Sequence, residues 1–199
     1  MVRELLLGPK RFTDLRGGLP HASPNVLSQR LRELERSGVV LRRKLGPPAG
    51  SWVYELTDWG RELGPIVAQL GRWGDRSPFP PREVDIGIDA AVLALRALFD
   101  PGAAAGLAAS YELRLGDDRF RVAVADGEIT LARGAAEVPD ATIQTTANTF
   151  AMLLARQRSL AVALRANEVV IEGGRPAVAR FLGLFTSPQP APAPELHAA

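Results

Sequence analysis

Residues 23–38 carry the most regular hydrophobic pattern of the chain. At 100° per residue, Leu27, Leu31 and Leu34 share one stripe of a helix, which we expect to pack inward. The opposite stripe carries hydrogen-bonding side chains: Asn25, Ser28, Gln29, Arg32 and Arg36. In a major groove, Asn and Gln pair with adenine, Arg pairs with guanine, and Ser pairs with either. The pattern fits an ordinary amphipathic helix with a solvated face or a helix that reads bases, and the flanking sequence favours the second.

This helix has a clear predicted beginning and end. Ser23 can cap the free amides of the first turn, and Pro24 follows where a missing N–H has no consequence. Gly38 supplies the left-handed residue that ends it.

The rest of the first half predicts a helix–turn–helix followed by a hairpin. A helical turn at 2–7 and a short helix capped by Thr13 precede the base-reading helix. Residues 39–44 and 52–56 have strand character and flank a Gly- and Pro-rich loop, so they predict a wing. A longer helix capped by Thr57 is expected to continue to about Gly74.

Beyond residue 87 the pattern changes to that of a mixed α+β domain. Apolar residues with helical spacing at 88–99 are followed by three alternating strands around 111–115, 120–124 and 129–131. Asp126-Gly127 between the last two strands is a two-residue hairpin signal. The remaining elements are expected as a strand at 141–146, two helices, a fifth strand at 168–172 and a last helix up to Phe185.

Charge divides the chain in the same way. The formal net charge is +2, but residues 1–76 carry 13 Lys and Arg against 8 Asp and Glu, whereas residues 77–199 carry 11 against 14. A basic half joined to a mildly acidic half fits a polyanion-binding module linked to a second domain.

Several kinds of chemistry are absent from the sequence. Cysteine does not occur, and the two histidines, His21 and His197, have no second ligand at metal spacing and no Ser/His/Asp set. We therefore expect no metal site, no cofactor and no enzymatic activity. The longest apolar run near the start, Leu5–Leu7, is too short for a signal peptide or a membrane span, so a cytoplasmic protein without a membrane partner is expected.

Three motifs in the first half resemble the HxlR family of bacterial winged-helix transcription regulators. They are RELLLGPKRF at 3–12, LSQRLRELE at 27–35 and YELTDWGREL at 54–63. The resemblance covers about residues 2–74 and implies a homodimer that places two recognition helices in successive major grooves of double-stranded DNA. It puts the recognition helix at 23–36 and the wing at 42–52. The expected DNA contacts are Ser23, Asn25, Ser28, Gln29, Arg32 and Arg36 on the helix, with Arg11, Arg42, Arg43 and Lys44 for phosphates.

The second half resembles the sterol-carrier-protein fold from about Ile88 to Phe185. The closest fit is the stretch from Ala141 through NEVVIEGG at 167–174 into the last helix. Proteins of that fold enclose an apolar tunnel for hydrophobic molecules, which implies an apolar small-molecule effector. The candidate ligand residues are Phe99, Tyr111, Phe120, Phe150, Leu153, Phe181 and Phe185, and each is also explained by an ordinary core.

The sequence thus predicts an α+β protein. Its N-terminal winged helix-turn-helix, residues 1–74, is joined by a Pro-rich linker, 75–84, to a sterol-carrier-protein-like sandwich, 85–186, with a five-stranded sheet and a disordered tail, 187–199. The predicted function is DNA-binding regulation modulated by an apolar molecule. The alternative is a lipid carrier whose winged helix serves only for dimerisation.

Overall fold

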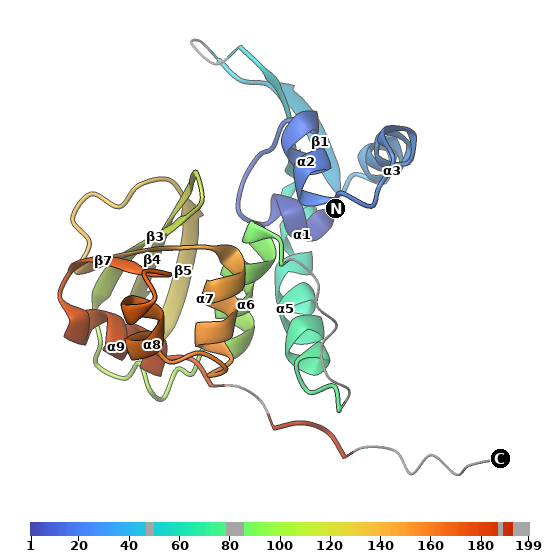
Figure 1. Ribbon diagram of the computed structural model, residues 1–199. Helices are drawn as coiled ribbons and strands as arrows, with labels where there is room; N and C mark the ends of the chain where they lie inside the picture. Colours follow the sequence, from blue (N-terminus) through green and yellow to red (C-terminus); the bar gives the residue numbers. More distant parts are fainter. Residues whose placement is uncertain (47–49, 79–85, 187–188, 193–199) are drawn as a thin grey trace.

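The computed structural model describes residues 1–46, 50–78, 86–186 and 189–192 (Figure 1). Its first half consists of α1 (Val2–Leu5), α2 (Phe12–Gly18), α3 (Pro24–Arg36), β1 (Val40–Lys44), β2 (Trp52–Leu56), α4 (Asp58–Arg61) and α5 (Leu63–Gly74). β1 and β2 form an antiparallel hairpin. The predicted helix–turn–helix and hairpin are therefore confirmed, while the predicted wing tip at 47–49 lies outside the described residues.

The core of this half is small and apolar. Leu15, Leu27 and Leu31 are fully buried, and Val40 and Leu56 close the cluster from the hairpin. Because Leu27 and Leu31 come from one stripe of α3, burying that stripe leaves the opposite side of the helix facing away from the core.

Three sequence predictions in this half need correction. Thr13 does not cap α2, because the helix begins at Phe12 and the amide of Arg11 donates to the Asp14 carboxylate, 3.1 Å away. α1 ends at Leu5 instead of Leu7, ahead of Gly8, which has φ +130° and precedes a proline. The helix capped by Thr57 is interrupted at Glu62.

Pro65 explains this interruption. In a continuous helix it would lack the N–H that bonds to the carbonyl of Arg61, and its ring would clash there. Starting a new helix at Leu63 puts Pro65 in a first turn, where no intrahelical N–H bond is needed. The cap itself is confirmed, since the Thr57 hydroxyl accepts from the amide of Gly60 at 3.0 Å.

The second half is a sheet covered by helices. Its elements are α6 (Ile88–Leu98), β3 (Ala109–Leu115), β4 (Asp118–Ala125), β5 (Glu128–Arg133), β6 (Ala141–Thr145), α7 (Ala147–Leu154), α8 (Leu160–Arg165), β7 (Val170–Gly173) and α9 (Arg175–Gly183). The strand order is β5-β4-β3-β6-β7, with β3 and β6 parallel and every other pair antiparallel. The α+β class and the five-stranded sheet are confirmed.

Local turn chemistry sets the strand boundaries. Asp126 and Gly127 both adopt positive φ, 54° and 74°, which is the conformation of the predicted tight hairpin between β4 and β5. The last strand starts at Val170, two residues later than predicted. Glu168 is not in the ladder, because its carboxylate is paired with Arg158 and its amide donates to Ala163.

One face of the sheet forms the larger core. Alternate residues of β3 and β4, such as Leu113 and Phe120, are fully buried and pair with one another in register. Helices α6, α7 and α9 supply the other side of that core, as Phe150 and Phe181 show. Figure 1 shows these helices gathered on one side of the sheet.

The two halves pack against each other along α5 and α6, which lie side by side in Figure 1. Gly71 lies beside Ala97, and the Arg72 guanidinium donates to the carbonyl of Ala97 at 2.7 Å. Leu7 belongs to the core of the second half although it precedes α2 in the chain.

Most residues of the predicted linker and tail lie outside the part of the chain that the structure describes. Residues 79–85, 187–188 and 193–199 are not described, so the linker 75–84 and the disordered tail 187–199 stay predictions there. In the described piece of the tail, the amide of Ala191 donates to the carbonyl of Arg76 at 2.7 Å. Among the helices that the structure describes, none has the length and apolarity needed to cross a membrane.

Candidate nucleic-acid interface

α3 begins and ends as its sequence predicts. The Ser23 hydroxyl accepts a hydrogen bond from the amide of Val26 at 3.3 Å, and Pro24 is the first helical residue. Gly38 follows the last turn with φ +73°. Two leucines of the apolar stripe, Leu27 and Leu31, are fully buried, which fixes the rotation of the helix about its own axis.

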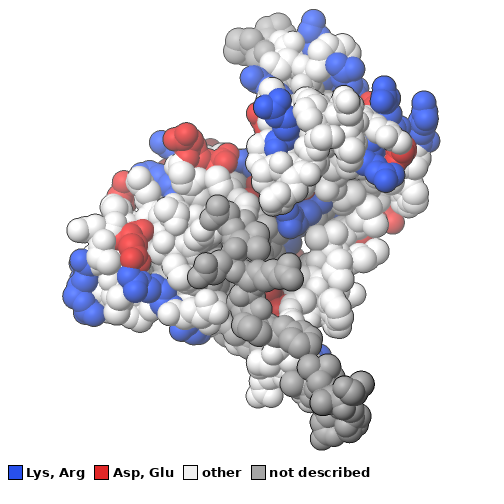
Figure 2. Space-filling view, turned by 45° about the vertical axis from the view of Figure 1, so that its right-hand side comes forward, with Lys and Arg blue, Asp and Glu red and all other residues white. Residues whose placement is uncertain are grey.

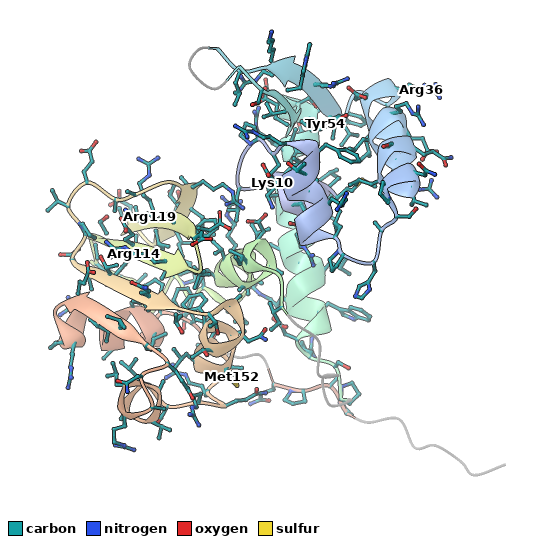
Figure 3. The ribbon with its side chains drawn as sticks, turned by 45° about the horizontal axis from the view of Figure 1, so that its top comes forward. Lys10, Arg36, Tyr54, Arg114, Arg119 and Met152 are labelled. Carbon is teal, nitrogen blue, oxygen red and sulfur yellow. The ribbon has the colours of Figure 1, made fainter. Side chains whose placement is uncertain are left out.

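The opposite stripe of α3 faces outward. Asn25, Gln29, Arg32 and Arg36 are exposed, and Ser28 is half-buried at the edge of the stripe. Figure 3 shows the labelled Arg36 pointing away from the body of the protein. Asn25, Arg32 and Arg36 make no hydrogen bond or ion pair with the described residues, so the fold does not engage their polar groups.

Gln29 is the exception on this stripe. Its amide nitrogen donates to the Glu33 carboxylate at 3.1 Å, and Glu33 also accepts from Arg30 at 2.7 Å. The Arg30 guanidinium, followed by the Gln29 amide, holds the pKa of Glu33 below its ordinary value. Gln29 must exchange this exposed bond for a base edge in order to read DNA.

The wing presents its cations on two different faces. Arg42 and Lys44 share a face with Trp52 and Tyr54, because Arg42 pairs with Tyr54 and Lys44 pairs with Trp52 in the strand register. The Arg42 guanidinium lies 4.7 Å from the centre of the Trp52 ring and 5.8 Å from that of Tyr54. This cation–π contact holds Arg42 in place while leaving it exposed.

Arg43 lies on the other face of the hairpin. Its Nε donates to the Glu55 carboxylate at 2.7 Å, and this bond raises the pKa of Arg43 above its ordinary value. Of the predicted phosphate contacts, Arg11, Arg42 and Lys44 are exposed without an ion pair to a described residue, whereas Arg43 is partly neutralised.

Cationic side chains are concentrated around these elements. Figure 2 shows Lys and Arg side chains over the upper part of the molecule, which contains α3 and the wing. All ten predicted DNA-contacting residues lie in this half, on α3, on β1 or directly before α2 or α3. The structure thus brings α3 and the wing together as one basic region, while the contacts themselves stay predictions.

A buried charged network lies beneath the wing, and sequence reasoning missed it. Lys10 is only 8 % exposed, and its Nζ donates to Glu4 at 3.0 Å and to Asp89 on α6. Arg133 also donates to Asp89 and reaches Asp118 at 2.6 Å. Lys10 and Asp89 are 79 positions apart, so no local pattern could have paired them.

Two carboxyls of this network, Glu4 and Asp89, have pKa values shifted in opposite directions. Burial raises the pKa of Asp89, and the nearby Lys10 and Arg133 offset only part of that effect. Burial acts in the same direction on Glu4, but hydrogen bonds and attraction from Lys10 and Arg3 outweigh it and lower the pKa of Glu4.

The predicted ligand residues lie in the packed interior of the second half. The seven side chains of this set are all buried: Phe99, Tyr111, Phe120, Phe150, Leu153, Phe181 and Phe185. The Phe181 ring contacts Tyr111, with centroids 4.6 Å apart, and Phe185 at 5.0 Å. These rings therefore fill the space between the sheet and α9, and ligand binding by them stays a prediction.

Two of the hollows on the described surface are open to solvent. One, of about 600 Å³, lies between α8 and α9 and is almost wholly apolar, with Arg165 and Arg175 in its lining. The other, of about 580 Å³, lies where α5 meets the end of α6 and is lined by Arg72, Arg96 and Phe99 among others. In the described part of the chain, no three His, Cys, Asp or Glu residues gather as a metal site would require.

Comparison with known proteins assigns the two halves of the chain to two different families. The HxlR-like helix-turn-helix family matches residues 1–79. The transcriptional regulator YvaP of Bacillus subtilis is 41% identical over 73 residues, covering 37% of this chain and 68% of YvaP. YdeP of the same organism is 37% identical over 78 residues, covering 38% of this chain and 59% of YdeP. The solved reduced form of B. subtilis YodB is 31% identical over 41% of this chain and 79% of YodB, with a TM-score of 0.36.

The second half has relatives of a different kind. The alkyl sulfatase C-terminal family matches residues 91–191. The solved sec-alkylsulfatase Pisa1 from Pseudomonas sp. is 21% identical over 52% of this chain, with a TM-score of 0.46. This chain spans only 16% of the length of Pisa1.

Proposed function

Because the chain belongs to the HxlR-like helix-turn-helix family through residues 1–79 and to the alkyl sulfatase C-terminal family through residues 91–191, we propose that it is a transcription regulator. In this proposal α3 reads operator DNA in the major groove, and the wing contacts the phosphate backbone beside it. The second half binds an apolar small molecule that modulates DNA affinity.

The observation that supports DNA binding best is the outward stripe of α3. Asn25, Arg32 and Arg36 are exposed and unbonded within the described residues, and a basic wing adjoins them. An ordinary amphipathic helix also has a polar outer face, but the adjoining basic wing favours DNA, whose base edges and phosphates match this set.

A dimer is the second part of the proposal. Ile66, Leu70 and Trp73 are 60 %, 62 % and 73 % exposed, and their spacing puts them on one stripe of α5. An exposed stripe of three large apolar side chains is typical of a protein interface. A second copy of the chain fits here, because two recognition helices are what an inverted-repeat operator requires.

The effector is proposed as an apolar molecule held by the second half. Likeness of this half to sterol carrier proteins is part of the same proposal, and two places could receive the molecule. The interior set around Phe181 would have to open, because its rings already touch one another. The hollow between α8 and α9 is open at the surface, and Arg165 and Arg175 suit an anionic head group there.

Binding of decanoate to variants of the full chain distinguishes these two candidate sites. We expect it to raise the melting temperature of the full chain. Leu164→Trp fills the hollow and Leu153→Trp fills the interior, so loss of the shift in only one variant identifies the site. Absence of any shift in the unmodified chain, for decanoate and for a panel of neutral apolar molecules, would remove the effector from the proposal.

DNA binding is tested by fluorescence anisotropy on random duplex and on sequences selected from a random library by the full chain. We expect selection to converge, and affinity to fall steeply with salt. The alternative function, a lipid carrier whose winged helix only dimerises, predicts no enrichment and no salt-dependent retention. An alkylsulfatase assay checks the separate expectation that the chain is not an enzyme.

A further inference from the structure

Lys10 links the wing to the second half of the protein. Its amide donates to the carbonyl of Tyr54 at 3.0 Å, and the amide of Tyr54 donates to the carbonyl of Lys10 at 2.8 Å. The main chain of Lys10 therefore pairs with β2 from outside the hairpin. Figure 3 shows Lys10 between the two halves, with Tyr54 above it on the wing.

The side chain of Lys10 extends from the same residue into the second half. Its ammonium group is buried between Glu4 and Asp89, and Asp89 lies in the first turn of α6. A buried ammonium group without carboxylate partners is strongly unfavourable, so its position follows that of Asp89.

Asp89 is itself fixed by the sheet. Its carboxylate accepts from Arg133 at the end of β5. The Arg133 guanidinium is held in turn by Asp118, 2.6 Å away, and by the Phe120 ring, whose centre lies 4.8 Å away. Asp89 is thus held by buried contacts within the second half, with only 2 % of its surface exposed.

The backbone pairing of Lys10 with Tyr54 connects Lys10 to Arg42, a predicted DNA contact. Tyr54 stands opposite Arg42 in the hairpin register, and the Arg42 guanidinium lies over the Tyr54 and Trp52 rings. If Lys10 moves, its backbone hydrogen bonds to Tyr54 change. The Tyr54 ring, which the Arg42 guanidinium contacts, then changes position.

We propose that Asp89 is a positioning residue for the wing: it anchors Lys10 from the second half and thereby holds β2 and Arg42 in the orientation that contacts DNA. The effect on DNA affinity rests on the proposed DNA-binding function, whereas the anchoring of Lys10 by Asp89 rests on the described contacts. It makes a helix of the second half part of the DNA-binding geometry, although that helix itself lies outside the interface.

The test uses the full chain carrying Asp89→Asn, which keeps the side-chain shape and an acceptor oxygen but removes the charge. The matched control is Glu112→Gln, because Glu112 is an equally buried carboxylate paired with Arg114 inside the second half, away from Lys10. Hydrogen exchange is followed at the amides of Lys10 and Tyr54, and duplex affinity is measured over a range of salt concentrations.

We expect Asp89→Asn to speed exchange at Lys10 and Tyr54 by about tenfold, with the amides of α3 unchanged. The slope of log affinity against log salt should fall by about 0.9 for each phosphate contact that the wing loses. Glu112→Gln should leave the salt slope unchanged and should speed exchange at Lys10 and Tyr54 no more than at the amides of α3. The double variant Lys10→Met/Asp89→Leu replaces both of these charges by apolar groups and leaves Glu4 paired with Arg3 and Arg133 paired with Asp118. It should show the same changes in exchange and in salt slope.

Unchanged exchange and an unchanged salt slope in a folded Asp89→Asn protein would overturn the inference. Equal effects from Glu112→Gln would overturn it too, because the change would then reflect general loosening of the second half. If the unmodified chain binds no DNA, the proposed function fails, and the exchange measurement alone decides whether Asp89 holds the wing.

Discussion

Arg43 and Glu55 form an ion pair across the two strands of the wing, with Nε and Oε1 2.7 Å apart. Arg43 is therefore unlike Arg42, whose guanidinium rests on two aromatic rings and has no carboxylate partner among the described residues. Two adjacent arginines of one strand differ in their availability for phosphate, because neighbouring residues of a strand point to opposite faces.

Removing the carboxylate should strengthen DNA binding. We expect Glu55→Gln to raise affinity for random duplex by about two- to fivefold, since Arg43 becomes free to contact a phosphate. Arg43→Ala should weaken specific and random binding about equally. Glu172→Gln is the control, because it removes one carboxylate partner of Arg114 on the sheet of the second half, where Arg114 keeps its pair with Glu112. Equal gains from both Glu→Gln variants would mean that net charge alone is responsible.

If α3 reads bases, its outward side chains should affect binding to the operator more than binding to random duplex. Gln29→Ala and Arg32→Ala should each weaken binding to the selected operator by roughly 1–3 kcal/mol and barely affect random duplex. Arg30→Ala, which changes an exposed arginine paired with Glu33 on the same helix, serves as the control. An operator affinity unaltered by Arg32→Ala would show that another face of α3 meets the DNA.

The apolar stripe of α5 predicts the assembly. Leu70→Glu should convert a dimer into a monomer, because a charge placed in an apolar interface loses its hydration. The half-sites of the operator should lie about one helical turn apart. Light scattering measures the change, and Val138→Glu, at an even more exposed apolar residue outside the stripe, should leave the dimer intact. A monomeric unmodified chain at micromolar concentration would contradict the proposal.

Glu112 predicts a pH dependence of stability. Burial raises its pKa, but the hydrogen bond from Arg114 and the amide of Ala136 outweigh burial and hold the pKa below its ordinary value. A lowered folded-state pKa contributes stability above the unfolded-state value, about 4.3, and this contribution is lost as the pH falls through the folded-state pKa. Glu112→Gln should therefore cost about 1 kcal/mol at pH 7 and progressively less below pH 4.

Urea unfolding at pH 7, 5 and 3 measures this difference. Glu128→Gln is the control, because Glu128 is exposed and has no hydrogen bond or ion pair to a described residue. A stability difference that stays constant down to pH 3 would show that the folded state does not lower the pKa of Glu112.

Local patterns were sufficient for most elements. The Ser23 cap, Gly38 and the leucine stripe predicted α3, and the alternation around Leu113 and Phe120 predicted two strands of the sheet. Each of these signals depends on neighbours within one or two turns of chain, where backbone hydrogen bonding and hydrophobic periodicity act directly. The errors at Thr13 and at Glu62 arose where two local preferences competed.

The sequence by itself determined which side chains of α3 face outward, because burying Leu27 and Leu31 leaves the opposite stripe exposed. Only the tertiary structure decided what lies beneath the wing. Lys10 meets Asp89 because α1 and α5 pack against α6, and that contact depends on long-range docking of apolar surfaces such as Leu7 and Gly71. Hydrophobic burial has no direction along the chain, so a pattern can mark the residues that are buried but not the distant partner that each one meets.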